Sequence, residues 1–328
     1  MRKIVLMICI LMISSMVNAT AGFGQDLMLG VRQLSLGGAF TGVADDQFAV
    51  YYNPAGLSSV DGLNFSINYS KNTVGESDIS FNTGNLTASY NFGKFGALGI
   101  NWYYSTSSDD NDGSEVFNVS EHNVELGYGY SFAENLSLDD KTFFNDFSMG
   151  FGTRLIGYGA DMDDVTDYFF WDIALDYSIL MKMMENRLTF GAMVQNLPYI
   201  CYDHAGWSGE DVLEIGYRTG LSYRFNKDNL DDFISADVSS ENEAVTIGVG
   251  AEKSFGLSFS DTNDLIIHRA GYRYGVDDKF HEFNLGLGYV LPTELFGKDV
   301  RFDYNFNYTG GEVAGDPMSH AFQLSFKF

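Results

Sequence analysis

The sequence predicts an all-β fold, a transmembrane antiparallel β-barrel of about 14 strands. Apolar and polar residues alternate without a break from Val300 to Tyr308, so that Val, Phe and Tyr oppose Arg, Asp and Asn. Similar stretches recur from Leu63 to Phe328 between turn-rich gaps. Successive side chains of a strand point to opposite faces, so each stretch offers one face to lipid and the other to a lumen.

The clearest alternating stretches give an even number of strands, about fourteen, each near the length that a tilted membrane strand needs. They are expected at residues 63–70, 85–92, 97–105, 122–132, 147–157, 169–179, 188–196, 213–225, 233–239, 245–253, 264–274, 281–291, 299–308 and 320–328. The four prolines, at positions 54, 198, 292 and 317, fall between these stretches, where a missing N–H interrupts no ladder.

Composition supports the barrel and limits its function. A hydrophobic content of 45% with 36 glycines and a mean hydropathy of −0.09 exclude a helical membrane protein. The aromatic content of 16% suits interfacial girdles. A soluble β-sandwich or propeller is the alternative, but it would have to pack many bulky Tyr and Phe side chains inside. The formal charge of −25 disfavours nucleic-acid binding.

Residues 1–21 have the pattern of a secretory signal peptide. Arg2 and Lys3 supply the positive start, Ile4 to Ile13 the apolar middle, and Ala19 to Ala21 a small-x-small cleavage site, so the mature chain is expected to begin at Gly22. A transmembrane anchor is the weaker alternative, because polar residues interrupt the apolar run short of the roughly 20 residues that a span needs. Cleavage takes the formal charge from −25 to −27 and leaves Cys201 as the only cysteine, which excludes an intrachain disulfide.

The alternation also assigns the two faces of the strands. In the stretch from Leu213 to Phe225, apolar residues such as Tyr217 and Leu221 should face lipid, and Arg218 and Ser222 the lumen. The same rule places charged residues of both signs in the lumen, where they can pair: Glu125, Arg154, Asp172, Asp176, Arg218, Asp237, Glu252, Arg269, Arg273 and Asp303. Short links (91–96, 181–186, 226–232) suit the periplasmic end, and longer ones (106–118, 132–146, 158–168, 197–211, 309–319) the extracellular end.

No motif indicates an enzyme, a cofactor or a metal centre. The loop from Ser107 to Gly113 resembles a calcium loop, but aligning Gly113 with the required glycine leaves two oxygen ligands missing. That loop and the acidic run from Asp161 to Asp167 are interpreted as solvated, with a weak divalent-cation site between loops as the alternative. The five histidines have no spacing that selects a catalytic partner.

The segment 22–61, ahead of the barrel at 62–328, is the informative non-strand region. Gly37 and Gly38 permit tight packing, Asp45 and Asp46 can cap a short helix at 47–52, and Asn53 can cap the next one. Irregular backbone at membrane depth must be enclosed in protein, so this segment is expected to be a lumenal hatch, with a periplasmic extension as the alternative. The predicted hatch and gating residues are Leu36, Gly37, Gly38, Phe40, Asp45, Asp46, Asn53, Pro54, Ala55 and Gly56.

These residues carry a resemblance. The strings Leu36-Gly-Gly-Ala-Phe40 and Asn53-Pro-Ala-Gly-Leu57 resemble the N-terminal region of the FadL-like superfamily, which includes long-chain fatty-acid transporters and the PorV/PorQ barrels of type IX secretion. Gly191 to Leu197 and Arg269 to Tyr272 resemble mid-barrel elements of the PorV/PorQ branch. The end of the chain, Phe322 to Phe328, is similar to the aromatic-ended last strand by which bacterial barrels are recognised for assembly, so Phe328 is the expected assembly signal.

The resemblance implies a fourteen-strand barrel with an N-terminal hatch in a Gram-negative outer membrane, in contact with its lipid and with the barrel-assembly machinery. The loops are acidic and lack an apolar capture groove. We therefore expect first a non-enzymatic docking or shuttle partner for secreted or surface-attached proteins and their secretion components. The alternative is a FadL-like transporter that passes a hydrophobic ligand through a hatch-gated lumen.

Overall fold

The computed structural model describes residues 28–74, 79–109, 118–133, 136, 143–162, 165–201, 215–226, 232–241, 244–256, 264–277, 279–292, 299–311 and 318–328. The predicted signal segment lies outside them.

Short helices come first: α2 (Val31–Ser35), α3 (Ala49–Tyr52) and η1 (Pro54–Ser59). The strands are β1 (Leu63–Val74), β2 (Ile79–Asn91), β3 (Ala97–Asp109), β4 (Asn118–Ser131), β5 (Phe144–Met162), β6 (Val165–Met183), β7 (Leu188–Gln195), β8 (Tyr199–Cys201), β9 (Gly216–Arg224), β10 (Phe233–Glu241), β11 (Ala244–Gly256), β12 (Leu265–Gly275), β13 (His281–Pro292), β14 (Asp299–Gly310) and β15 (Met318–Lys327), with η2 (Gly93–Phe95) between β2 and β3.

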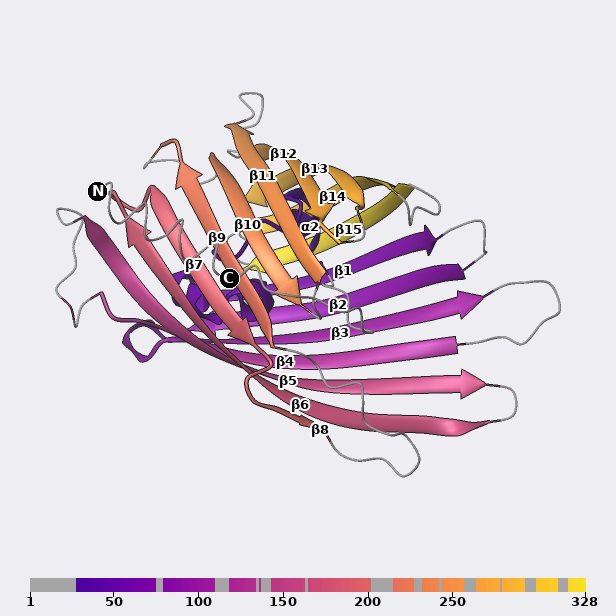
Figure 1. Cartoon of the computed structure of the whole chain (residues 1–328). Coiled ribbons are helices and arrows are strands. Elements are labelled where there is room, and N and C mark those ends of the chain that lie inside the picture. Colours follow the sequence, from indigo (N-terminus) through magenta and orange to yellow (C-terminus); the bar gives the residue numbers. More distant parts are fainter. Residues whose placement is uncertain are drawn as a thin grey trace.

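The strands form one closed antiparallel barrel (Figure 1). The pairing runs β5-β4-β3-β2-β1-β15-β14-β13-β12-β11-β10-β9-β7-β6, and the pairing of β6 with β5 closes the ring. The three-residue strand β8 pairs only with β6 among the described strands and adds no position to the ring. The predicted fourteen-strand barrel is therefore confirmed, and closure leaves no free edge along the ring.

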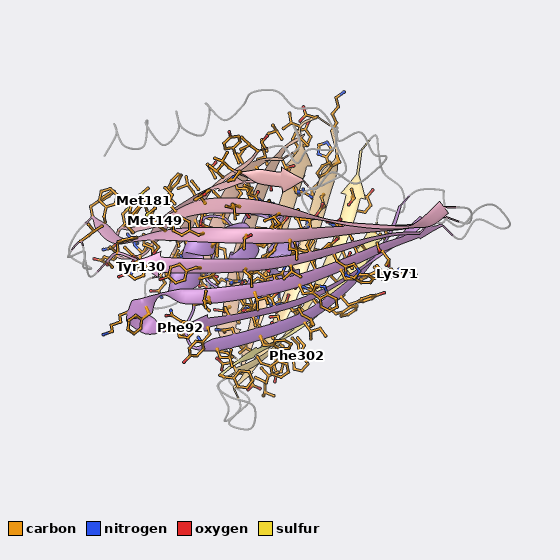
Figure 2. All side chains as sticks on the ribbon, turned by 90° about the horizontal axis from the view of Figure 1, so that it is seen from below. Lys71, Phe92, Tyr130, Met149, Met181 and Phe302 are labelled. Carbon is orange, nitrogen blue, oxygen red and sulfur yellow. The ribbon has the colours of Figure 1, made fainter. Side chains whose placement is uncertain are left out.

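Exposure alternates along the strands. In β9, Tyr217 is 43% exposed and Arg218 3%, and in β13 Leu285 is 60% exposed and Asn284 1%. The outward residues are large and apolar, and Figure 2 shows Phe92, Tyr130, Met149 and Met181 gathered near one end of the barrel and Lys71 toward the other. Among the described residues, no helix is long and apolar enough to cross a membrane.

We name the two ends of the barrel by their connections. The turn end carries the β2–β3 and β6–β7 turns, and there the N–H of Phe328 donates to the carbonyl of Leu63. The loop end carries the β3–β4 and β14–β15 connections. The expectation that residues 132–146 lie with the extracellular loops is wrong, because they join β4 to β5 at the turn end. Of the predicted extracellular link 158–168, residues 158–162 continue β5 and residues 165–168 begin β6, since both strands extend past their predicted bounds.

Candidate functional site

The segment from residue 28 to residue 60 packs against the inward faces of the barrel strands and is called the hatch from here on. It contacts β2 to β6 through η1 and β12 to β15 through α2. Its apolar side chains form a core together with Tyr103 of β3 and Phe233 of β10. In this core Leu36, Phe40, Phe48 and Tyr52 are fully buried. A polar, glycine-bearing segment thus folds compactly inside the ring of strands (Figure 1).

Local sequence explains the hatch backbone. Gly37 and Gly38 have φ values of +63° and +76°, which residues with a Cβ rarely adopt. Asn53 caps η1 by accepting from the Ala55 N–H at 3.2 Å, with Pro54 at the first position. The predicted helix at 47–52 is shorter, Ala49–Tyr52, and the prediction that Asp45 and Asp46 cap it is wrong, because its N-cap residue is Phe48 and no side chain caps it. Asp46 accepts from the Phe48 N–H just before the helix, and Asp45 pairs with arginines.

Arg32 is the centre of the charged contacts of the hatch. It is 4% exposed and lies 2.6 Å from an Asp45 oxygen, 3.1 Å from an Asp46 oxygen and 2.9 Å from an oxygen of Glu252 in β11. Arg224 of β9 holds Asp45 from the other side at 2.9 Å. Strands β9 and β11 therefore bind the hatch through charge-assisted hydrogen bonds, which are stronger than hydrogen bonds between neutral groups.

The two hatch aspartates differ in electrostatics. Burial raises the pKa of both carboxyls, but at Asp45 the neighbouring Arg32 and Arg224 outweigh it and its pKa lies below the usual value. The pKa of Asp46 stays above its usual value, because burial prevails there over Arg32. Burial lowers the pKa of Arg32, yet Asp45 and Glu252 overcome this effect and hold that pKa well above the usual value.

The contacts continue into the barrel wall. Arg269 of β12 lies 2.5 Å from Glu252 and 2.8 Å from Asp303 of β14, and Arg301 lies 2.8 Å from Asp303. Each of these groups except Arg301 is nearly inaccessible to solvent. Buried charges of this kind are tolerated when each has a partner, so the hatch and four strands, β9, β11, β12 and β14, share one connected ionic cluster.

Three further barrel residues hold the hatch. Asp237 of β10 accepts from the backbone N–H of Phe40 at 3.0 Å and from that of Thr41 at 2.6 Å. The guanidinium carbon of Arg218 in β9 lies 4.9 Å from the ring centre of Tyr51. Two positions along the ring from β9, the Asn53 side chain donates to the Ile179 carbonyl of β6 at 3.0 Å.

A ring of lumen-facing glycines surrounds the hatch, and we call it the glycine belt. A Cβ at any of them would come within 3.0 Å of a hatch atom. At Gly191 the nearest atom is the Thr41 carbonyl oxygen at 2.0 Å, and at Gly271 it is the Gly37 nitrogen at 2.3 Å. The hatch therefore packs backbone against backbone. The belt comprises Gly99, Gly127, Gly129, Gly150, Gly191, Gly220, Gly248, Gly250, Gly271 and Gly286.

Other described lumenal side chains form polar pairs. Asn101 donates to Glu125 at 2.9 Å, and Asn305 donates to Asn284 at 2.9 Å. These residues are buried, and amide groups satisfy one another along neighbouring strands. The described lumen is thus amide-rich and charged, in contrast to the apolar outer face.

The pairing of β7 with β9 ends beside β8, while the chain stays paired with β6: the Leu197 N–H donates to the Leu175 carbonyl at 2.8 Å, and the Leu175 N–H donates to the Pro198 carbonyl at 3.1 Å. The β7–β9 ladder ends at Gln195 and Gly216, and Asn196 then turns the chain with a φ of +61°. The Asn196 N–H donates to Asp176 at 2.9 Å, its side-chain oxygen accepts from Arg154, and Arg154 pairs with Asp176 at 3.2 Å. The predicted strand at 188–196 therefore stops one residue early, and a buried polar cluster holds the turn.

The predicted site residues are distributed as follows. All ten hatch residues lie in the described hatch, and seven of them are buried, the exceptions being Gly38, Asp45 and Asp46. Glu125, Arg154, Arg218, Glu252 and Arg269 are each at most 6% exposed. Arg273 lies 3.6 Å from Glu282. Asp172 lies in β6, but its side chain is outside the described ones, and Phe328 is 47% exposed.

Sequence reasoning did not single out Arg32 or the glycine belt. A signal for Arg32 exists, because it is the only basic residue between Gly22 and Asp61. A signal for the belt is the recurrence of glycine at positions that alternate with apolar residues. Within the described part of the chain, no group of three or more His, Cys, Asp or Glu side chains is arranged to hold a metal ion. The acidic loop residues 110–113 and 163–164 lie outside that part.

No protein-family model matches the chain, and no curated protein does so either. Solved structures do share its fold. The toluene transporter TbuX of Ralstonia pickettii superposes with a TM-score of 0.61 at 11% identity, over 93% of this chain and 100% of that one. The fold is FadL-like.

Two further structures support that assignment. A mutant of the monoaromatic hydrocarbon channel TodX superposes with a TM-score of 0.58 at 11% identity, over 92% of this chain and 100% of that one. A FadL homologue of Pseudomonas aeruginosa gives 0.56 at 12% identity, over 94% and 99%. At these identities the likeness shows the fold alone, a closed antiparallel β-barrel.

Proposed function

We propose that the protein is an outer-membrane channel for small hydrophobic molecules, closed by the hatch and opening sideways to the membrane where the pairing of β7 with β9 ends, beside β8. The comparisons that support this proposal are with a toluene transporter and a monoaromatic hydrocarbon channel. They favour the transport alternative over the docking role that the sequence suggested first.

The observation that carries the proposal is the turn at 196–198, where the β7–β9 pairing ends while the chain stays hydrogen-bonded to Leu175 of β6. It is held by Asp176 and Arg154, two buried charges that a continuous strand would not need. Because the described lumen is polar, a hydrophobic molecule gains little by following it to the turn end. A sideways exit into the bilayer agrees with both features, and the hatch then serves as the closed floor of the channel.

Uptake measurements test this proposal. The full-length protein is expressed in a bacterium that lacks its own FadL-type transporter, and entry of radiolabelled toluene is followed over seconds. We expect faster uptake than in empty cells, and a loss of that gain in Asp176→Asn, which removes the anchor of the Asn196 turn. Asp61→Asn, at a side chain that is 83% exposed, is the matched control and should behave as wild type. Uptake equal to that of empty cells contradicts the proposal.

A docking partner for exported proteins is the second candidate. The glycine belt favours it, because a hatch packed backbone against backbone has little room to slide, so the barrel can act as a fixed anchor with its function at the rim. Removing the gene in the source bacterium separates the two. Loss of surface-attached proteins with unchanged hydrocarbon uptake supports docking, and the reverse result supports transport.

A further inference from the structure

A lysine–histidine pair lies on the outer face of the barrel toward the loop end. Lys71 of β1 pairs directly with His320 of β15, and both side chains are exposed. The Tyr304 hydroxyl lies 2.8 Å from His320 Nδ1. When that hydroxyl donates, the neutral ring carries its proton on Nε2, so Nε2 and the Lys71 ammonium are both donors toward the outside.

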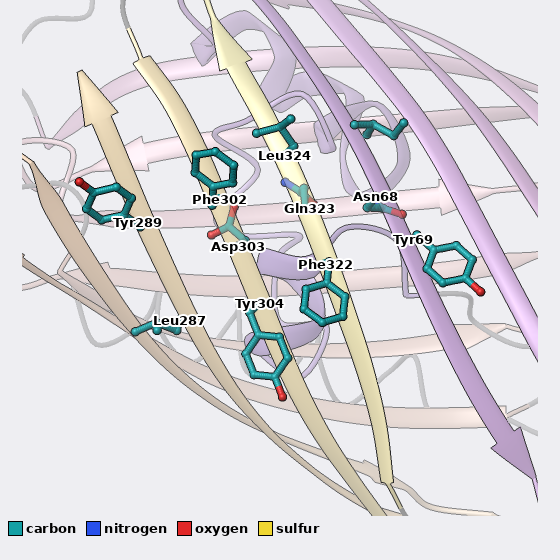
Figure 3. Close-up of a pocket in the computed structure, with 11 residues that line it drawn as sticks. Asn68, Tyr69, Leu287, Tyr289, Phe302, Asp303, Tyr304, Phe322, Gln323 and Leu324 are labelled. Atoms are coloured by element: carbon teal, nitrogen blue, oxygen red, sulfur yellow. The ribbon is translucent and has the colours of Figure 1, made fainter. Parts of the chain in front are cut away.

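An apolar groove of about 460 Å³ begins one row below this pair (Figure 3). Its outward residues form two rows across four strands, as the register of β1, β15, β14 and β13 shows. The rows are Tyr69, Phe322, Tyr304 and Leu287, then Ile67, Leu324, Phe302 and Tyr289. Four strands span about 14 Å, which is wide enough for several acyl chains side by side.

The position of Lys71 makes its charge informative. It follows the first residue of β1 by eight positions, about 27 Å along a strand and about 20 Å in height at a usual barrel tilt. This places its ammonium near the loop-side boundary of an apolar band about 25 Å tall. Lys71 makes no ion pair with any described residue, and its cross-strand neighbours His320 and Asn82 carry no carboxylate. A lysine on a lipid-facing surface is stabilised when its ammonium reaches an anionic headgroup.

We infer that the groove and the Lys71–His320 pair bind one membrane lipid, namely lipid A of the loop-side leaflet. Its acyl chains occupy the groove, and one phosphate accepts from Lys71 Nζ and His320 Nε2. A lipid with several chains and a phosphorylated headgroup matches the width of the groove and the charge at its top. This site depends on the membrane location of the barrel and is independent of what the lumen transports.

Native mass spectrometry of the full-length protein tests the inference. The protein is purified in a mild detergent, incubated with lipid A or with phosphatidylglycerol, and scored for retained lipid. Lys71→Gln and Lys71→Gln/His320→Gln remove the donors, and Ile67→Trp fills the groove while keeping both donors. Lys94→Gln removes the same charge from an exposed side chain at the turn end and is the matched control. Heat-modifiable migration on gels verifies that each variant is folded.

Wild type should retain one lipid A molecule per protein. The amount of lipid A retained by Lys71→Gln should be about five-fold lower, and the amount retained by the double variant should be lower still. Ile67→Trp should also retain less, and Lys94→Gln should equal wild type. Equal retention in all variants overturns the site. An equal loss in Lys94→Gln assigns the effect to overall charge and also overturns it. Equal retention of phosphatidylglycerol by wild type overturns the assignment to lipid A.

Discussion

The Arg32 guanidinium binds the Glu252 carboxylate through two hydrogen bonds of 2.9 Å each, and this contact joins the hatch to strand β11 across 220 positions of sequence. Planar two-point pairing fixes orientation as well as distance. Both groups are almost fully buried, so their pairing determines whether the hatch can stay docked in the lumen.

Breaking this pair should loosen the hatch. Glu252→Gln leaves Arg32 and Arg269 without their shared carboxylate, and loss of one partner of a buried pair costs about 3–5 kcal/mol. We expect a cysteine placed at Ala39 in a Cys201→Ser background to become reactive with a bulky thiol reagent in this variant and to resist it otherwise. Lys253→Gln, which alters the neighbouring exposed side chain, should leave the cysteine protected. Equal labelling of the two variants would refute a structural role for the pair.

The glycine belt gives a second prediction. Gly191→Ala places a methyl group 2.0 Å from the Thr41 carbonyl, so the hatch or the wall must shift, at a cost of about 1–3 kcal/mol. Gly84→Ala is the control, because a Cβ there meets nothing within 4 Å. Thermal unfolding, followed by heat-modifiable migration, should show a lower midpoint temperature than wild type for Gly191→Ala and an unchanged midpoint for Gly84→Ala. Similar midpoints would show that the hatch does not press on the wall.

Alternation alone predicted much of the barrel and less of the hatch contacts. The alternation of apolar and polar residues determines that Glu252 and Arg218 face inward, because a shift of the strand register by one residue would turn both side chains toward lipid. It cannot say that Glu252 meets Arg32, since that depends on closure of the ring and on the fold of the hatch. It also cannot distinguish a lumenal side chain in water from one against the hatch. Ser222 donates to the Gly42 carbonyl at 2.8 Å, so a larger side chain at this lumenal position would press on the hatch.

The lipid-facing surface can be tested at Leu285, which is 60% exposed near the middle of β13. Leu285→Arg should cost about 2–4 kcal/mol, because a charge at the bilayer midplane loses its hydration. Leu285→Ala keeps the site apolar and should cost much less. Reversible unfolding by denaturant in lipid vesicles measures both. Equal costs would mean that this face of β13 does not contact hydrocarbon.

Acid should release the hatch through Asp45. Its pKa is lowered in the folded protein by Arg32 and Arg224, so its contribution to stability is present above the ordinary value of about 3.9 and is lost as pH falls through the native value. Asp46, whose pKa is raised by burial, has the opposite effect on stability. It takes up its proton at a higher pH than Asp45, so its effect is complete before Asp45 is protonated. Conductance in planar bilayers should therefore stay low from neutral pH to about pH 5 and rise well below pH 4. Asp45→Asn should conduct at neutral pH and lose this acid step, and an unchanged acid step would assign it to other groups.

Deleting part of the hatch tests whether it closes the lumen. Removal of Val31 to Asp46 takes away Arg32, the Phe40 and Thr41 N–H groups held by Asp237, and the backbone that fills the belt at Gly271. The ring of strands keeps its ladder, so the deletion should yield an assembled barrel that conducts ions, while the intact protein stays nearly closed. Heat-modifiable migration establishes assembly, and single-channel recording measures conductance. An assembled deletion variant that remains closed would mean that the lumen is blocked elsewhere, and the hatch would then lose its role as the floor of the proposed channel.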